Sequence, residues 1–321
     1  MATYKEINGT AVQNVAGNPS NPIIGEVWYN SSTATFKILN FGPVGSWATK
    51  NNLNSGRSDL AGAGTATAAL AFGGNQGGKQ ALTEIYNGTN WTEVNDLNTA
   101  RYRLGGAGAS NTAALAFGGL NIPGGPPYDF AVTENWNGTN WTEVNDLNTA
   151  RYSGGDAGTN TSALFFGGEP AAPAVESWNG SNWTTVNALN TPRRGVSGSG
   201  ASNTAALAFG GNPNTAATEL WNGSNWTEVN DLNTARNEPG STGTTTSSLC
   251  FGGNNPAIAL TESWNGTNWT ETGDMGTARY VMGSAGASNT SALGFGGSPT
   301  NNVTEQFSSS DAPITQTITT S

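Results

Sequence analysis

The chain contains no histidine, only one cysteine and few charged side chains. Of its 321 residues, 11% are charged, compared with roughly 25% in an ordinary globular domain. Without histidine there can be no Ser-His-Asp or Cys-His nucleophile pair and no histidine-ligated metal. A single cysteine allows no internal disulfide and no thiolate cluster. We therefore expect neither a metal site nor a cofactor.

Clusters of basic residues and long apolar runs are also missing. The 22 acidic and 12 basic side chains give a net charge of −10, and no stripe of lysine and arginine is present to contact phosphates, so we expect no nucleic-acid partner. No apolar run reaches the length of about 18 residues that a membrane span needs, so we expect no membrane insertion. The opening MATYKEINGT lacks the charged and apolar regions of a signal peptide.

Internal repeats are the strongest feature that is present. The segment NGTNWTEVNDLNTARY occurs unaltered at 87–102 and at 137–152. A Phe-Gly-Gly triplet recurs six times at intervals of 42 to 49 residues, beginning at Phe72, Phe117, Phe166, Phe209, Phe251 and Phe295. Each triplet is followed by a Glu-x-aromatic step, and in five copies a tryptophan follows that aromatic five residues later. Such a period is typical of a solenoid or a propeller.

Each repeat reads as four short strands. An Asn-Gly turn between two aromatic segments predicts a hairpin in which both central residues have positive φ. The sixth repeat lacks its last strand, and the matching half stands near the N-terminus as Gly45-Ser46-Trp47-Ala48-Thr49-Lys50. Pairing of this strand into the last sheet would close a ring and leave no open edge. The prediction is an all-β protein, a six-bladed β-propeller of four-stranded blades closed by an N-terminal strand.

Two family resemblances follow from these residues. The Gly-Gly doublet, the aromatic of the third strand, the tryptophan of the fourth and the following arginine resemble the Kelch repeat, which is also found in galactose-oxidase-like propellers. The segment from Gly25 to Lys37 (GEVWYNSSTATFK) is similar to a short hairpin of bacteriophage fibre and other virion proteins. These resemblances imply a virion attachment segment at 1–44, a Kelch-like propeller at 45–307 and a polar tail at 308–321.

Six of the eight arginines occupy one position of the repeat. One interpretation is a positive collar around the channel that binds an acidic ligand, since arginine makes bidentate contacts with carboxylates and phosphates. The alternative is that each arginine pairs with the glutamate of a repeat, because a buried charge needs a partner. The residues are Arg57, Arg101, Arg151, Arg193, Arg236 and Arg279, with Glu84, Glu134, Glu176, Glu219, Glu262 and Glu305.

The segment between the Gly-Gly doublet and the Thr-Glu step is the part of the repeat that varies most in length and in amino-acid content. The longest such loop, 120–132, contains Tyr128, Asp129 and Phe130. Variable loops on one face of a rigid scaffold are typical binding surfaces, although loops also drift freely in sequence. Tyr102, Tyr152 and Tyr280, each directly after a repeat arginine, would add flat surfaces for sugar rings.

Carboxylates at two equivalent repeat positions offer the best catalytic alternative. Asp59 and Glu238 each lie two residues after a repeat arginine, and such a pair could act as acid and base on a glycosidic bond. By contrast, the repeat tryptophans are expected to pack between blades, and Cys250 is expected to be buried.

The sequence therefore predicts a non-enzymatic virion protein, made in the host cytoplasm and carried on an extracellular phage particle. Its expected task is adhesion through the propeller, either to a host surface glycan or to a neighbouring virion protein, while residues 1–44 attach it to other virion proteins. A glycan depolymerase or sialidase-like glycosidase at the channel mouth and a purely structural capsid or tail decoration remain as alternatives. Formation of a homo-oligomer is compatible with each of them.

Overall fold

The computed structural model describes residues 13–17, 19, 27–122, 128–170, 173–254 and 256–318. Throughout these ranges the regular secondary structure is β-strand. No helix in this part of the chain is long and apolar enough to cross a membrane. The chain divides into two compact units, one of Gly45–Ser308 and one of Met1–Val44 with Ser309–Ser321.

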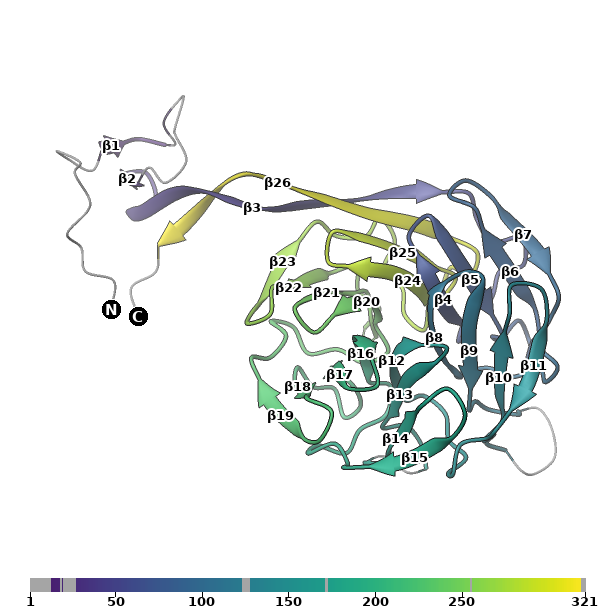
Figure 1. Ribbon diagram of the computed structural model, residues 1–321. Coiled ribbons are helices and arrows are strands. Elements are labelled where there is room, and N and C mark those ends of the chain that lie inside the picture. The colour runs from purple at the N-terminus through teal and green to yellow at the C-terminus, as the bar shows by residue number, and fades with distance from the viewer. Residues whose placement is uncertain are drawn as a thin grey trace. The chain divides into compact units, whose positions relative to one another are not determined.

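The larger unit is a ring of six four-stranded antiparallel sheets, which confirms the predicted six-bladed propeller (Figure 1). Each of the first five blades consists of four consecutive strands. Blade 1 contains β4 (Ala61–Thr65), β5 (Ala68–Phe72), β6 (Thr83–Tyr86) and β7 (Trp91–Val94). Blade 2 contains β8 (Gly105–Ser110), β9 (Ala113–Phe117), β10 (Thr133–Trp136) and β11 (Trp141–Val144).

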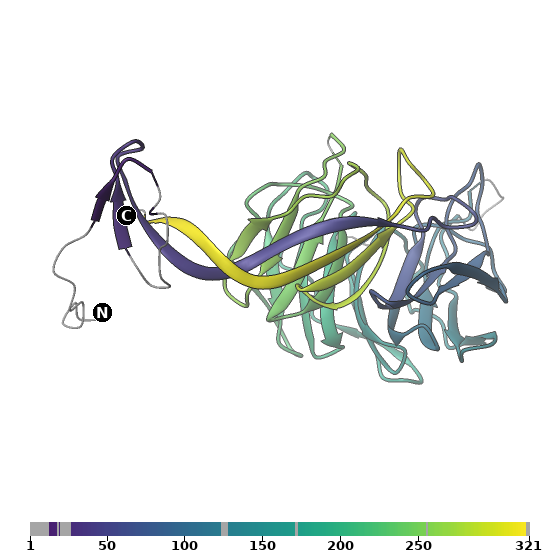
Figure 2. The same ribbon diagram turned by 90° about the horizontal axis from the view of Figure 1, so that it is seen from above.

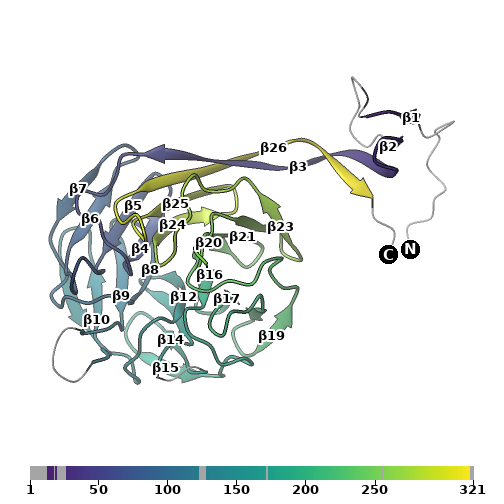
Figure 3. The ribbon, with the colours of Figure 1, turned by 180° about the vertical axis from the view of Figure 1, so that it is seen from behind.

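The next three blades repeat this order, and their sequence around the ring can be followed from behind in Figure 3. Blade 3 contains β12 (Gly155–Thr159), β13 (Ser162–Phe166), β14 (Val175–Trp178) and β15 (Trp183–Val186). Blade 4 contains β16 (Ser197–Ser202), β17 (Ala205–Phe209), β18 (Thr218–Trp221) and β19 (Trp226–Val229). Blade 5 contains β20 (Gly240–Thr244), β21 (Ser247–Phe251), β22 (Thr261–Trp264) and β23 (Trp269–Thr272).

The two ends of the chain complete blade 6. Its strands are β24 (Gly283–Ser288), β25 (Ser291–Phe295), β26 (Thr304–Ile318) and β3 (Thr35–Lys50), in that order within the sheet. The predicted closing strand is therefore confirmed. Trp47 of β3 takes the place of the missing repeat tryptophan, because its ring lies 4.8 Å from that of Phe251 and its indole donates to Thr261 Oγ1 at 3.0 Å. Both long strands β3 and β26 can be followed in Figure 2.

In the N-terminal unit, β2 (Val27–Asn30) forms a hairpin with the first part of β3, so that Val27 pairs with Ile38. The hairpin expected at 25–37 is thus observed from residue 27 onward, while residues 25 and 26 lie outside the described residues. β1 (Gln13–Val15) pairs in parallel with β2. Residues 308–318, expected as a tail, continue β26.

Aromatic contacts join every pair of neighbouring blades. The tryptophan of each fourth strand packs on the phenylalanine of the Phe-Gly-Gly triplet in the preceding blade, with ring centroids 4.8 to 5.2 Å apart at all six interfaces. Glycine on the innermost strands makes room for these rings: a Cβ added to Gly105 would lie 2.2 Å from the Phe117 ring. The tryptophans and glycines of the repeat are therefore explained by packing.

The Asn-Gly turns differ in detail from the prediction. Gly88 has a φ of +92°, but its neighbour Asn87 is not among the residues with positive φ. The Asn87 side chain instead accepts hydrogen bonds from the backbone amides of Thr89 and Asn90 at 3.0 and 2.9 Å. The loop has four residues and is stabilised by this side chain, so a two-residue turn with two left-handed positions is not needed.

Candidate functional site: the mouth of the central channel

The six repeat arginines do not form an exposed collar. Each guanidinium is at most 1% exposed and forms an ion pair with the repeat glutamate of the blade that its linker enters, at 2.5 Å for Arg57 and Glu84 and 2.7 Å for Arg101 and Glu134. The other four pairs repeat this contact: Arg151–Glu176, Arg193–Glu219, Arg236–Glu262 and Arg279–Glu305. The alternative interpretation of structural pairing is therefore the correct one, because no ligand can reach these groups.

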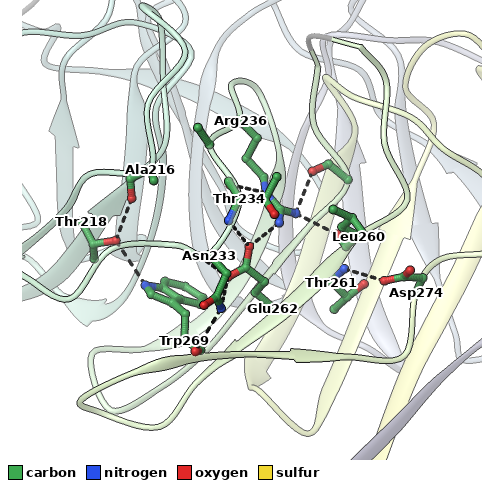
Figure 4. A network of polar contacts seen from close by, with 12 residues as sticks. Ala216, Thr218, Asn233, Thr234, Arg236, Leu260, Thr261, Glu262, Trp269 and Asp274 are labelled. Atoms are coloured by element: carbon green, nitrogen blue, oxygen red, sulfur yellow. Dashed lines mark hydrogen bonds and ion pairs between the residues drawn. The ribbon is translucent and has the colours of Figure 1, made fainter. Parts of the chain in front are cut away.

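Figure 4 shows this network at the entry to blade 5. Arg236 pairs with Glu262 and donates to the Leu260 carbonyl at 2.8 Å. Glu262 also accepts the backbone amides of Asn233 and Thr234 at 2.7 and 3.2 Å. Burial of both charges is compensated by several hydrogen bonds, which is the condition for a stable buried pair. The repeat Arg and Glu residues thus fasten each linker to the blade that follows.

Two residues beyond each repeat arginine, the chain adopts the same left-handed backbone in all six repeats. The φ values lie between +47° and +56°. We call these residues the inner ring: Asp59, Arg103, Ser153, Gly195, Glu238 and Val281. Glycine fits this conformation without strain and Asp and Asn tolerate it, whereas most other side chains cost about 1–3 kcal/mol. One of the six residues is glycine and one is aspartate, so four positions hold a side chain that this backbone conformation disfavours.

Backbone hydrogen bonds connect the inner ring into a closed circle. Each amide donates to the carbonyl of the equivalent residue in the preceding blade, at 2.8 Å for Asp59 to Val281 and 2.8 Å for Arg103 to Asp59. The remaining four bonds measure 2.7 to 3.1 Å: Ser153 to Arg103, Gly195 to Ser153, Glu238 to Gly195 and Val281 to Glu238. The left-handed backbone is what turns each amide toward its neighbour, so the strain has a structural role.

Two further circles surround the inner ring. The residue before each inner-ring position forms a β-bridge with the first residue of the loop after the Gly-Gly doublet, as in Tyr102 with Leu120. The middle ring is Ser58, Tyr102, Tyr152, Arg194, Asn237 and Tyr280, and the outer ring is Asn75, Leu120, Glu169, Asn212, Asn254 and Ser298. The varied loops and the arginine linkers therefore share one face of the propeller.

These rings line a hollow of about 550 Å³ at the channel mouth, which we call the funnel. The three tyrosines predicted as sugar platforms and both carboxylates of the catalytic alternative lie in its lining. Among the described residues, the lining is Asp59, Asn75, Tyr102, Arg103, Leu120, Tyr152, Glu169, Arg194, Gly195, Asn212, Asn237, Glu238, Asn254 and Tyr280. Its volume falls within the range of roughly 300–1,000 Å³ typical of small-molecule sites.

Arg103 lies between the two carboxylates of the catalytic alternative. Its Nε is 2.9 Å from Asp59 Oδ1, and its Nη1 is 3.2 Å from Glu238 Oε1. Arg103 belongs to the linker that enters blade 2 and Glu238 to the linker that enters blade 5, so the pair connects opposite sides of the six-membered ring. Burial raises the pKa of Glu238, and the neighbouring Arg103 guanidinium opposes that shift.

A second charge cluster lies on the blade 3 side of the funnel. Glu169 accepts a hydrogen bond from the Tyr152 hydroxyl at 2.6 Å and forms an ion pair with Arg194. The bond to the Glu169 carboxylate, together with burial, raises the pKa of Tyr152. Each cluster therefore places a guanidinium group against at least one carboxylate. The Tyr152 hydroxyl stays protonated.

The longest varied loop lies beside the funnel. Tyr128 is 50% exposed and Ile122 is 45% exposed, while Asp129 bridges to Leu120 of the outer ring. None of Tyr128, Asp129 and Phe130 is among the funnel-lining residues. Residues 123–127 of the same loop lie outside the described residues. Tyr128 and Ile122 are thus two exposed apolar side chains of this loop.

Below the inner ring the channel continues as a chamber lined mainly by small residues and containing Asp156. Asp156 Oδ2 accepts the Gly106 amide at 3.0 Å, and burial raises the pKa of this carboxyl to about 7. Cys250 is buried elsewhere, within the packing between blades, and burial raises the pKa of its thiol to about 12. Among the described residues no group of three or more carboxylate or thiol side chains is placed to hold a metal ion.

Sequence reasoning missed Arg103, Arg194, Glu169 and the asparagines of the funnel. The signal was available: Arg103 occupies the same repeat position as Asp59 and Glu238, and Arg194 the same position as Tyr102. These positions differ in residue type from repeat to repeat, so the repeat pattern alone does not single them out. Comparison of the chain with protein-family models and with curated proteins finds no match.

Proposed function

We propose that this propeller is a non-enzymatic, Kelch-like binding protein that takes a glycan in the funnel. The observation that carries the proposal is a contrast between two kinds of repeat position, those that pack the blades together and those that form the three rings. Packing positions hold the same residue type in nearly every blade, whereas the equivalent inner, middle and outer ring positions hold different polar and aromatic residues. Since the backbone is the same in all six repeats, folding does not account for these differences.

The chemistry of the lining supports a saccharide ligand. Tyr102, Tyr152 and Tyr280 supply flat apolar faces with a polar tip, which suit the C–H faces and hydroxyls of a sugar ring. Asparagine amides both donate and accept hydrogen bonds, as sugar hydroxyls do. The side chains retained at left-handed positions, which cost backbone strain, also favour a functional role for the inner ring.

Binding to immobilised bacterial surface glycans tests the proposal. Tyr280→Ala removes one aromatic face from the funnel lining. We expect a loss of about tenfold in affinity, equivalent to roughly 1.4 kcal/mol. Thr92→Ala on the exposed outer strand of blade 1 is the matched control and should bind as the native protein does. Equal affinity of the native protein and Tyr280→Ala would contradict the proposal.

The catalytic alternative is less well supported. A retaining or inverting glycosidase needs one free carboxylate and one protonated carboxyl facing the substrate, and Arg103 occupies the space between Asp59 and Glu238. We therefore propose binding without hydrolysis. Release of reducing ends from a bound glycan by the native protein, and its loss in Asp59→Asn/Glu238→Gln, would reverse this choice.

We further propose that the protein is carried on a bacteriophage particle through residues 1–44, so that the propeller is displayed outward. Support comes from the likeness of the 25–37 hairpin to virion proteins and from the assignment of 1–44 to a compact unit apart from the propeller. Mass spectrometry of purified particles tests the location. Deletion of residues 1–34, which leaves β3 and hence blade 6 intact, should abolish incorporation. If glycan binding were absent while incorporation depended on 1–34, a purely structural decoration would be favoured.

A further inference from the structure

The floor of the funnel is closed. The inner ring is a continuous circle of backbone hydrogen bonds, and the Arg103 side chain reaches across it to Glu238 of the opposite linker. The funnel above and the chamber below have only four lining residues in common: Asp59, Arg103, Gly195 and Glu238. A ligand in the funnel therefore meets a polar floor made by Arg103 and its two carboxylate partners, and this shape suits the end of a chain.

Each cationic group in the funnel lining is already neutralised. Arg103 is paired with Asp59 and Glu238, and Arg194 is paired with Glu169. Three carboxylates against two guanidinium groups leave the lining with one excess negative charge, within a chain of net charge −10. An anionic ligand would meet repulsion and would have to displace an existing ion pair before it gained a partner.

Uncharged hydrogen-bonding groups make up most of the remaining polar lining. Four asparagines belong to it, together with the three tyrosine hydroxyls. These groups match hydroxyl and acetamido substituents without requiring a charge on the ligand.

On the basis of the proposed glycan-binding function, we propose that the funnel takes the uncharged terminal sugars of a glycan chain and rejects their anionic counterparts. The ion pairs of the funnel act as the specificity-determining element, because they supply polar contacts and leave neither guanidinium group of the lining unpaired. The same arrangement predicts binding that depends little on salt, since no net charge is neutralised when an uncharged ligand enters.

Matched oligosaccharides that differ only in a terminal anionic group test this inference. N-acetyllactosamine and its sialylated and sulfated forms are titrated against the full chain by calorimetry and on an array. We expect the uncharged form to bind at least tenfold more tightly than either anionic form. Its affinity should change by less than a factor of two between 50 and 500 mM salt. Equal or tighter binding of the anionic forms would overturn the inference while leaving glycan binding intact.

Charge removal in the funnel gives the converse test. Asp59→Asn/Glu169→Gln frees Arg194 and part of Arg103, and asparagine tolerates the φ of +54° at position 59. We expect anionic oligosaccharides to gain at least tenfold in affinity, in a salt-sensitive manner. Glu93→Gln/Glu143→Gln makes the same change in net charge on exposed outer strands and should give no gain.

The single variant Glu169→Gln covers the case in which the double variant fails to fold, and it should show a smaller gain of the same sign. Equal gains in the funnel and outer-strand variants would overturn the inference, because net charge alone would then explain the selectivity. If neither these oligosaccharides nor the immobilised bacterial surface glycans bind the native protein, the proposed glycan-binding function itself fails.

Discussion

Trp226 and Val175 meet at the interface between blades 4 and 3 without the hydrogen bond that the other interfaces contain. Elsewhere the indole N–H of the fourth-strand tryptophan donates to a threonine hydroxyl of the preceding blade, as in Trp269 to Thr218 at 3.2 Å. Valine stands in place of that threonine in blade 3, and the buried Trp226 Nε1 has no hydrogen-bond partner among the described residues. The missing bond is a local defect in an otherwise regular ring.

Val175→Thr should repair this defect. A hydroxyl at position 175 would accept the Trp226 indole N–H, and satisfying one buried donor is worth about 1 kcal/mol in the free energy of unfolding. The reverse change, Thr218→Val, should destabilise by about the same amount. Urea unfolding of both variants measures the effect, and a Val175→Thr protein no more stable than the native one would contradict the expectation.

Breaking one of the buried Arg–Glu pairs should be far more damaging. Arg236→Met leaves the Glu262 carboxylate buried beside Asn233 and Thr234 without its cation, and removal of one partner of such a pair costs about 3–5 kcal/mol. A second substitution, Glu262→Gln, removes the stranded charge and should recover part of the loss. A double variant as unstable as Arg236→Met would argue against charge as the cause. Chemical denaturation gives the three free energies.

A glycine substitution in the inner ring should raise the free energy of unfolding. Val281 is β-branched and has a φ of +47°, a conformation in which such a side chain is strained. Val281→Gly relieves about 1–3 kcal/mol of strain and loses up to 1 kcal/mol through greater freedom of the unfolded chain. We expect a net gain of about 1 kcal/mol and a higher melting temperature. Gly195→Val, at the equivalent position, should show a loss, and equal stabilities of all three proteins would contradict the role of strain.

Because of Asp156, we expect the stability of the folded protein to fall as the pH rises. Its pKa in the folded protein is about 7 because of burial, above the value of about 3.9 for an unfolded chain. The proton is therefore held more tightly in the folded state, so the stabilisation is complete below about pH 4 and is lost as the pH rises through 7.

The expected loss between pH 5 and pH 8 is on the order of 2 kcal/mol. Asp156→Ser copies Ser241 and Ser284, the residues at this position in blades 5 and 6, and should abolish this part of the pH dependence. Thermal unfolding at pH 5 and pH 8 compares the two proteins. Parallel pH profiles would show that Asp156 is not the group responsible.

The amino-acid sequence by itself determined the architecture. Six Phe-Gly-Gly triplets, the repeated tryptophans and the displaced half-repeat around Trp47 specify six blades and their closure, because each feature serves local strand geometry or contact with the next blade. The sequence also indicated the pairing of repeat arginines with repeat glutamates, as in Arg57 with Glu84. Both residue types occur six times at fixed repeat positions, and a buried charge needs a partner of opposite sign.

Only the tertiary structure decided the composition of the funnel. Arg103 and Glu238 are far apart in the chain and belong to linkers on opposite sides of the ring, so their contact exists only after all six blades have closed. Likewise, Tyr152, Glu169 and Arg194 come together because a varied loop bridges back to the neighbouring linker. The repeat encodes the scaffold through what its copies share, whereas the site arises where the copies differ and the ring brings those differences to one axis.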